Sequence, residues 1–330
     1  MSQPPFSLRD AKLPEDYPAL AEILSATRPD WPTSAEDLER HDAKRDPAHY
    51  FTHVVAEQGG KIVGLGGAGH DDFSFEEWRY WGGVNVLPEA RGQGIGAALY
   101  AELLRRLQER GAREIRTMSS SKPHAAAGRR FLEQRGWKVN WERFESEIHT
   151  ENIDLHAFDD LLSGVAGEGV RLVSLAELEA DPERNRKLYE LDWILFQDVP
   201  LGTALTKKTL EQWVKEEIDD PQLRPKLSFV AVRGGQNDPL TGDYVGYSTL
   251  GRSRGEHYYI GMTGVLRSER GKGIAKALKV AAMRALHGEG GGVIKTFNDS
   301  PNKAMLQMNE QLGFQRTATM YRYELKLGEA

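Results

Sequence analysis

The sequence predicts an α/β fold, layered in the α+β manner, that occurs twice in tandem. The chain has 330 residues, about twice the usual size of one domain. Predicted strands and helices alternate along it, which indicates helices packed in layers against a sheet. Two sequence blocks also recur in the same order at nearly the same separation. They indicate one duplicated domain of roughly 150–170 residues rather than a solenoid, whose repeats are far shorter.

The first block is a glycine-rich segment. It reads VNVLPEARGQGIGAAL at residues 84–99 and TGVLRSERGKGIAKAL at residues 263–278. The second block reads FLEQRGW at residues 131–137 and MNEQLGF at residues 308–314. Since both blocks keep their order and register, each half of the chain should build the same set of elements.

The boundary between the repeats is expected in HAFDDLLSGVAGEG, a short amphipathic segment that ends in glycine and small residues. We therefore predict an N-terminal domain over residues 1–155, a linker over residues 156–168 and a C-terminal domain over residues 169–330.

Each repeat is expected to contain a hairpin, a further strand and a long helix. In the first repeat THVVAEQGGKIVGLGGAG predicts a hairpin around Gly59 and Gly60, and RYWGGVNVL predicts the next strand. A helix is predicted over residues 95–110 because leucines recur at helical spacing and Gly111 provides a stop. HYYIGMTGVL and ALKVAAMRALHGEG are the corresponding strand and helix of the second repeat.

Composition excludes several classes of function. The formal net charge of -6 argues against a general nucleic-acid binder. The chain has no cysteine, so it has no disulfide framework, no thiolate metal site and no cysteine nucleophile. We expect no metal. It also has no apolar run of about 18 residues and no apolar stretch of signal-peptide length at its start, so we expect a cytoplasmic protein without a membrane anchor.

The glycine-rich segment has the composition of an anion-binding loop. Glycine lets the backbone approach a ligand closely. The N–H groups at a helix start, with about half a positive charge from the helix dipole, favour an anion. Arg91, Arg270 and Lys272 add mobile positive charge. These features together favour a pyrophosphate group as the ligand.

Two other phosphate-binding loops do not fit the spacing. A dinucleotide-binding fingerprint requires G-x-G-x-x-G, whereas the first repeat has its glycines at 92, 94 and 96. A P-loop requires Gly-Lys followed by Ser or Thr, whereas Gly271 and Lys272 are followed by Gly273.

The loop resembles the acetyl-coenzyme A pyrophosphate loop of the GNAT N-acetyltransferase superfamily, whose pattern is Gln/Arg-x-x-Gly-x-Gly/Ala. The second block resembles the closing A-x-x-Φ-Y-x-x-x-G-F motif of that superfamily. A single copy would also fit a plain glycine-rich turn, but two copies, each followed by the second block, favour the family. The resemblance covers most of both halves. The chain also resembles the tandem members of the superfamily that are similar to mycothiol synthases. It implies two folds, each a mixed, mostly antiparallel twisted sheet flanked by helices.

The resemblance implies that each loop holds the pyrophosphate of acetyl-CoA. In the superfamily a free backbone N–H at the end of the preceding strand binds the thioester carbonyl. By position it belongs to Val86 and Val265, or to Leu87 and Leu266. The expected cofactor-binding residues are these four together with Arg91, Gly92, Gln93, Gly94, Ile95, Gly96, Arg270, Gly271, Lys272, Gly273, Ile274, Ala275, Asn298 and Asn302.

Amide side chains in the second repeat have two interpretations. Asn298 and Asn302 lie where superfamily members often have amides that contact the pantetheine arm and the phosphates, but the same residues also suit a turn and a helix cap.

The superfamily often places a proton-donating tyrosine four residues before the closing glycine. That position holds Leu132 in the first repeat and Asn309 in the second. Leucine cannot donate a proton, and asparagine can only form hydrogen bonds.

Candidates for the general base lie on or near the strand before each loop. Some superfamily members carry a glutamate on the strand before the loop, where this chain has Tyr80 and Tyr259. His257 shares a face with Tyr259 if the strand has period two, although a lone strand histidine is more often structural. Asp198 is a candidate for binding the acceptor amine. The expected catalytic residues are Val265, Tyr259, Asn309 and His257.

We therefore expect an acetyl-CoA-dependent N-acetyltransferase that transfers acetyl directly to a small-molecule amine in a ternary complex, without an acyl-enzyme. The C-terminal half is the expected catalytic half, and the N-terminal half is expected to be degenerate. Two alternatives remain: acetylation of a protein or peptide amine, and a non-catalytic CoA-binding regulatory module. We expect no nucleic-acid partner. Two domains in one chain supply a pseudo-dimer, so we expect a monomer.

Overall fold

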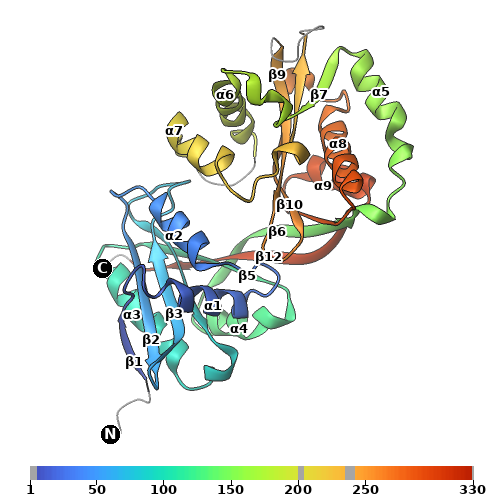
Figure 1. Ribbon diagram of the computed structural model, residues 1–330. Helices are drawn as coiled ribbons and strands as arrows, with labels where there is room; N and C mark the ends of the chain where they lie inside the picture. Colours follow the sequence, from blue (N-terminus) through green and yellow to red (C-terminus); the bar gives the residue numbers. More distant parts are fainter. Residues whose placement is uncertain (1–5, 200–203, 235–241, 329–330) are drawn as a thin grey trace, which may run out of the picture. The chain divides into compact units, whose positions relative to one another are not determined.

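The computed structural model describes residues 6–199, 204–234 and 242–328 (Figure 1). The rest, including the first residues of the predicted N-terminal domain, lies outside the described chain. Two compact units are present. Unit 1 contains the chain through Arg143, a short segment ending at Thr206, and the residues from Ala318 onward. Unit 2 contains the residues between Phe144 and Thr317 apart from that segment.

Unit 1 is a sheet in the order β1-β2-β3-β4-β5-β12, with helices packed on it. Neighbouring strands are antiparallel except β4 and β5, which are parallel. Its strands are β1 (Ser7–Asp10), β2 (Phe51–Gln58), β3 (Lys61–Gly69), β4 (Arg79–Val86), β5 (Glu114–Ser120) and most of β12 (Gln315–Lys326). Its helices are α1 (Tyr17–Thr27), α2 (Ala35–Ala43), α3 (Ile95–Gln108) and α4 (Ala126–Glu133), with short 3-10 turns η1 (Pro88–Ala90) and η2 (Pro123–Ala125).

Unit 2 repeats this order as β7-β8-β9-β10-β11-β6, and β10 and β11 are again the parallel pair. Its strands are the end of β6 (Lys138–His149), β7 (Val170–Ser174), β8 (Phe229–Arg233), β9 (Asp243–Arg252), β10 (Tyr258–Val265) and β11 (Val293–Asp299). Its longer helices are α5 (Asp159–Gly167), α6 (Arg184–Phe196), α8 (Ile274–Gly288) and α9 (Lys303–Leu312). Its short helices are α7 (Leu210–Trp213), η3 (Thr150–Asn152), η4 (Leu155–Phe158), η5 (Glu177–Ala180), η6 (Val214–Ile218), η7 (Pro225–Leu227) and η9 (Arg267–Glu269).

In unit 2, α6 and α7 lie on one side of β9 and β10, and α8 and α9 lie on the other (Figure 1). Two repeats of a mixed, mostly antiparallel sheet flanked by helices confirm the predicted fold class.

The last strand of each sheet comes from the other half of the sequence. β12, at the end of the chain, pairs with β5 from Met320 opposite Ser120 to Lys326 opposite Glu114. The end of β6, which follows the first repeat, lies beside β11 in unit 2. The units thus divide at residues 143 and 144, before the predicted boundary. The predicted linker over 156–168 forms η4 and α5, and Val165 of α5 is buried in unit 2.

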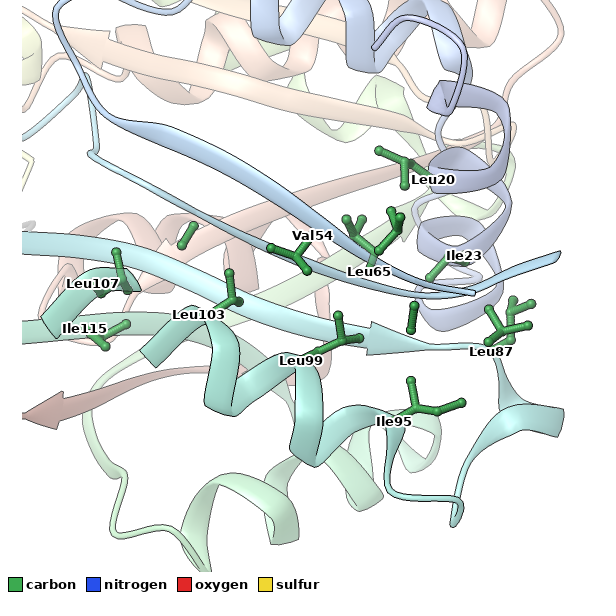
Figure 2. Close-up of a cluster of buried hydrophobic side chains, with 14 of the residues drawn as sticks. Leu20, Ile23, Val54, Leu65, Leu87, Ile95, Leu99, Leu103, Leu107 and Ile115 are labelled. Carbon is green, nitrogen blue, oxygen red and sulfur yellow. The ribbon is translucent and has the colours of Figure 1, made fainter. Parts of the chain in front are cut away.

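The core of unit 1 packs around both faces of its sheet (Figure 2). The strands run between the helix that carries Leu20 and Ile23 and the helix that carries Leu99, Leu103 and Leu107. The predicted leucine stripe of α3 accounts for one layer, because Leu99, Leu103 and Leu107 are all nearly inaccessible to solvent.

The core of unit 2 contains a lysine. Lys279 lies on the buried face of α8 among Val280, Met283 and Leu286, and its side chain is only 2% exposed. Its ammonium donates a hydrogen bond to the amide oxygen of Asn309 at 2.6 Å. Burial away from water disfavours the charged form and lowers the pKa of Lys279 to about 7.

Removal of the C-terminal strand should unfold unit 1. A chain that ends after Thr317 exposes the edge of β5 and removes Tyr323, which is 2% exposed in the unit 1 core. We expect loss of amide hydrogen-exchange protection in β2 and β3. A chain that ends after Leu327 is the control and should keep its protection. Unchanged protection after the longer deletion would contradict the structural role of β12.

Replacement of the buried lysine should stabilise the protein in a pH-dependent way. The unfolded chain holds the Lys279 proton up to about pH 10, whereas the folded chain releases it near pH 7, so wild-type stability rises across this window. Lys279→Met removes that dependence. Its free energy of unfolding should exceed the wild-type value at pH 6, and the excess should fall by roughly 1.4 kcal/mol per pH unit from about pH 7 to pH 10. Denaturant titrations at several pH values measure this, and a pH-independent difference would refute the lowered pKa.

Candidate active site

The glycine loops of the two repeats have matching backbone geometry. Gly92 and Gly94 have φ of 78° and 85°, and Gly271 and Gly273 both have φ of 79°. Such left-handed values favour glycine, which explains the residue type at these positions. Helix α3 begins directly after the first loop and α8 directly after the second. Within the described chain no side chain caps either helix start, so their first N–H groups are open to a ligand.

The arginine of each loop is fixed in the same way. Nε of Arg91 donates to the carbonyl of Val86, and Nε of Arg270 donates to that of Val265, each at 3.1 Å. The rest of each guanidinium therefore lies beside a strand end and a helix start. In unit 2, Asp198 forms ion pairs with Arg267 and Arg270. These arginines hold the pKa of Asp198 below its usual value. The carboxylate proposed from sequence for the acceptor amine thus contacts the loop arginines instead.

The strand before each loop separates from its parallel neighbour. In the described chain β4 is paired with β5 over Arg79–Trp81, and β10 is paired with β11 at Tyr258 and Tyr259. Beyond these residues the ladder ends while β4 and β10 continue toward their loops. One edge of each strand therefore faces a gap in the sheet.

The strand register decides which N–H groups face this gap. The N–H of Leu87 donates to the carbonyl of Val63, and that of Leu266 donates to that of Val245, both at 2.9 Å. These two N–H groups are engaged. Because antiparallel residues alternate in direction, the N–H groups of Val86 and Val265 point to the opposite edge, toward the gap.

The same alternation adds donors that the sequence motif did not indicate. Val84 and Thr263, two residues earlier, also direct their N–H groups to the gap. A β-bulge between Ile260 and Thr263 sets this register in β10. The Thr263 hydroxyl hydrogen-bonds Ser248 at 2.8 Å inside unit 2, so it is held by its neighbour strand.

The other loop residues anchor or enclose the site. Ile95 and Ile274 are buried and fix the helix starts in the core. A Cβ at Gly96 would lie 3.7 Å from Val86, an ordinary contact, which agrees with Ala275 at the matching position. The Gln93 amide accepts from Gln58, and Lys272 donates to Glu269.

A chain of polar side chains lies beside the gap of unit 2. Asn309 of α9 donates from Nδ2 to Oδ1 of Asn298, at the end of β11, over 2.6 Å. Asn309 also accepts from Lys279. Asn302 instead caps α9 by accepting from the N–H of Met305 at 3.3 Å, as the helix-cap interpretation predicts. The sequence motifs did not indicate Lys279, although a lysine on the apolar stripe of a predicted helix is a signal for an unusual core position.

We call the cluster of Asn298, Asn309 and Lys279 the polar corner of unit 2. The corresponding corner of unit 1 has a different composition. Leu132 replaces Asn309, and Tyr100 stands at the position of Lys279. Tyr100 accepts a hydrogen bond from the indole of Trp137 at 3.3 Å and packs edge-on against Phe131. The first repeat therefore closes this corner with aromatic and aliphatic side chains.

The candidate bases are not gathered at the glycine loops. His257 is buried just before β10, at the strand end away from the loop, and its ring hydrogen-bonds Ser253. Tyr259 donates to Gln222 at 3.1 Å. Tyr80 is buried and stacks on His70 in unit 1, where burial raises its pKa. A tyrosine with an ordinary or raised pKa is a poor base at neutral pH.

In the described ranges no three His, Asp or Glu side chains are grouped so that they could hold a metal ion. No helix in those ranges combines the length and the apolar composition needed to cross a membrane.

The chain is similar in sequence to known proteins. A family model described as the acetyltransferase (GNAT) family matches residues 17–137 and 185–314. Mycothiol acetyltransferase of Catenulispora acidiphila is 25% identical over 285 residues, which cover 85% of this chain and 82% of that protein. N-alpha-acetyltransferase 30 of Schizosaccharomyces pombe is 27% identical over 128 residues, which cover 36% of this chain and 83% of that protein.

Solved structures share the fold. A tandem GNAT protein from the clavulanic acid biosynthesis pathway has a TM-score of 0.72 at 17% identity, with 98% of this chain and 99% of that chain covered. A GCN5-related N-acetyltransferase from Sphaerobacter thermophilus has a TM-score of 0.67 at 19% identity, with 99% and 97% covered. The family model matches both repeats and most of the chain. The chain therefore belongs to the GNAT acetyltransferase family, whose members generally use acetyl-CoA, and carries two copies of its fold.

Proposed function

We propose that this protein transfers an acetyl group from acetyl-CoA to the amine of a small molecule, and that unit 2 is the catalytic half. The observation that carries the proposal is the open strand edge of β10 next to an uncapped glycine loop. It offers N–H donors for a carbonyl and for phosphates within one continuous segment. The polar corner formed by Asn298, Asn309 and Lys279 favours unit 2 over unit 1.

Of the four loop glycines with positive φ, three lie open, whereas a Cβ at Gly273 would meet Cδ1 of Leu161 at 2.7 Å. A Cβ at Gly92, Gly94 or Gly271 would meet no atom within 4 Å, so the space over these residues is open. The N–H groups of Gly271, Lys272 and Gly273 and of the first turn of α8 would bind the phosphates. Arg270 would add a charge-assisted contact once it exchanges Asp198 for a phosphate oxygen.

The strand edge would stabilise the reacting carbonyl. Acetyl-CoA supplies the activated acyl group, and the N–H of Val265 or Thr263 would donate to the carbonyl oxygen as it gains negative charge. One well-placed donor of this kind contributes about 3 kcal/mol to catalysis. The chain has no cysteine to carry an acyl group, so we propose direct attack by the amine.

Two classes of acceptor are supported by the relatives. Mycothiol acetyltransferase is similar over most of the chain, and its name indicates a small-molecule substrate. N-alpha-acetyltransferase 30 is similar over one third of the chain, and its name indicates an α-amine. We favour a small amine because the longer match spans both repeats. A peptide α-amine is the second candidate.

Release of CoA in the presence of amines tests the proposal. The full-length protein is incubated with acetyl-CoA and a panel of amino sugars, amino acids, polyamines and peptides, and free thiol is measured. We expect at least one small amine to raise CoA release above the rate without an amine. If only peptides do so, the second candidate is correct. If CoA binds but no amine raises its release, a CoA-binding regulatory module is favoured.

Charge introduced into one loop at a time should show which units bind the cofactor. Gly92→Glu and Gly271→Glu place a carboxylate beside the expected phosphates, at positions of nearly equal φ and with free space. We expect Gly271→Glu to weaken binding to unit 2 at least tenfold and to abolish acetyl transfer, whereas Gly92→Glu should retain acetyl transfer. Calorimetry with acetyl-CoA counts the remaining sites.

Matched asparagine variants control for backbone strain. Asparagine tolerates a positive φ better than most residues and carries no charge, so Gly92→Asn and Gly271→Asn should bind acetyl-CoA better than the glutamate variants. Loss of acetyl transfer in Gly92→Glu, with transfer retained in Gly271→Glu, would place the active site in unit 1.

A further inference from the structure

One buried hydrogen-bonded chain connects the core of unit 2 to the end of β11. It runs from Lys279 on α8 through Asn309 on α9 to Asn298, with both links at 2.6 Å. Lys279 and Asn309 are each 2% exposed. In the described part of the chain, Asn298 Nδ2 has no hydrogen-bond partner.

The chemistry of the three groups fixes the direction of this chain. While Lys279 is protonated, its ammonium can only donate, so Asn309 must turn its amide oxygen toward Lys279. Its Nδ2 then faces Asn298, which must turn its own oxygen toward Asn309. The Nδ2 of Asn298 is left at the outer end, with hydrogen-bond donors to offer. Without Lys279, either amide could rotate by 180° and present an acceptor instead.

The outer end of the chain lies at the gap beside β10. β11 is paired with β10 as far as Lys295, and Asn298 lies three residues beyond, where β10 has separated. Across the gap, β10 offers the N–H groups of Thr263 and Val265. A ligand that enters from the glycine loop of α8 therefore passes between backbone donors on one strand and an amide donor on the other.

The core does not need this arrangement for packing. Unit 1 builds the corresponding corner from Tyr100, Leu132 and Trp137, without an ammonium. A buried ammonium without a carboxylate partner is unfavourable for stability. Departures of this kind from apolar core packing are concentrated at functional sites.

We propose that Lys279 is a positioning residue that holds Asn309 and Asn298 in one amide orientation, so that Asn298 donates to a carbonyl of the pantetheine arm of acetyl-CoA. This inference rests on the proposed use of acetyl-CoA by unit 2. Lys279 itself touches neither the cofactor nor the acceptor. Its effect is on affinity for the arm, whereas the phosphates are bound by the separate glycine loop.

Two probes separate the arm from the nucleotide. CoA contains the pantetheine arm, and 3′-phosphoadenosine 5′-diphosphate lacks it. Calorimetry is performed on the full-length Gly92→Glu variant, in which only unit 2 is expected to bind a probe, so the measured heat comes from unit 2. We expect Lys279→Met to weaken CoA binding about tenfold, the effect of one lost directional contact, and to leave the affinity for 3′-phosphoadenosine 5′-diphosphate within about twofold. Kinetically the KM for acetyl-CoA should rise more than kcat falls.

Further variants test the connection. Asn298→Ala should reproduce the tenfold loss of CoA affinity. Lys279→Met combined with Asn298→Ala should lower the affinity no further than either substitution alone, because both residues act on one contact. Asn309→Leu is made together with Lys279→Met, so that no ammonium is left without its acceptor. Tyr100→Phe, at the matching position of unit 1, is the control and should leave CoA binding to unit 2 unchanged.

The possible failures are distinguishable. If the Gly92→Glu protein binds neither probe, the proposed site in unit 2 itself is wrong. If it binds both probes but Lys279→Met binds CoA as tightly as the parent, or the two substitutions are additive, the positioning role of Lys279 is wrong while the cofactor site stands. Equal loss of both probes in Lys279→Met would also overturn the positioning role, because it would show a disturbed loop.

Discussion

The short parallel pairing within each sheet is the constraint on which the candidate site depends. β4 leaves β5 after Trp81, and β10 leaves β11 after Tyr259. A β-strand whose edge loses its partner must satisfy its N–H groups elsewhere or leave them to a ligand. The antiparallel neighbour keeps the other edge fixed, so the open donors are held rigidly. The N–H groups of Leu87 and Leu266 are engaged, and the glycine loop and the helix start that follow add further open donors.

Duplication has conserved this constraint and changed the corner beside it. Both arginines hold the carbonyl at the end of the preceding strand, and both loops have two glycines with similar positive φ values. The corner behind the gap is aromatic and aliphatic in unit 1 but amide and ammonium in unit 2. Since each sheet takes its last strand from the other half of the sequence, neither repeat forms its sheet from its own residues alone. A repeat that no longer catalyses would therefore still be required for folding.

Local signals in the sequence predicted several of the elements around the candidate site. The glycine spacing, the leucine stripe of α3 and the hairpin around Gly59 and Gly60 depend on neighbouring residues, and they correspond to observed elements. Non-local features escaped prediction. Choosing Val265 over Leu266 as the free donor requires the β9–β10 register, and the exchange of β6 and β12 requires pairing across the whole chain.

Proton balance limits which acceptors suit such a site. A thiolate leaving group has a pKa near 8.5, so its release without an acid costs about 2 kcal/mol at pH 7, and water can supply that proton. A lysine-like amine must first lose a proton at a pKa near 10.4, which costs about 4.6 kcal/mol. Neither His257 nor Tyr259 is free to act beside the loop, since each is held at the far end of β10. An α-amine with a pKa near 8 avoids most of that cost. We therefore expect the acceptor to be an amine of low basicity, for which a strong base in the protein is unnecessary.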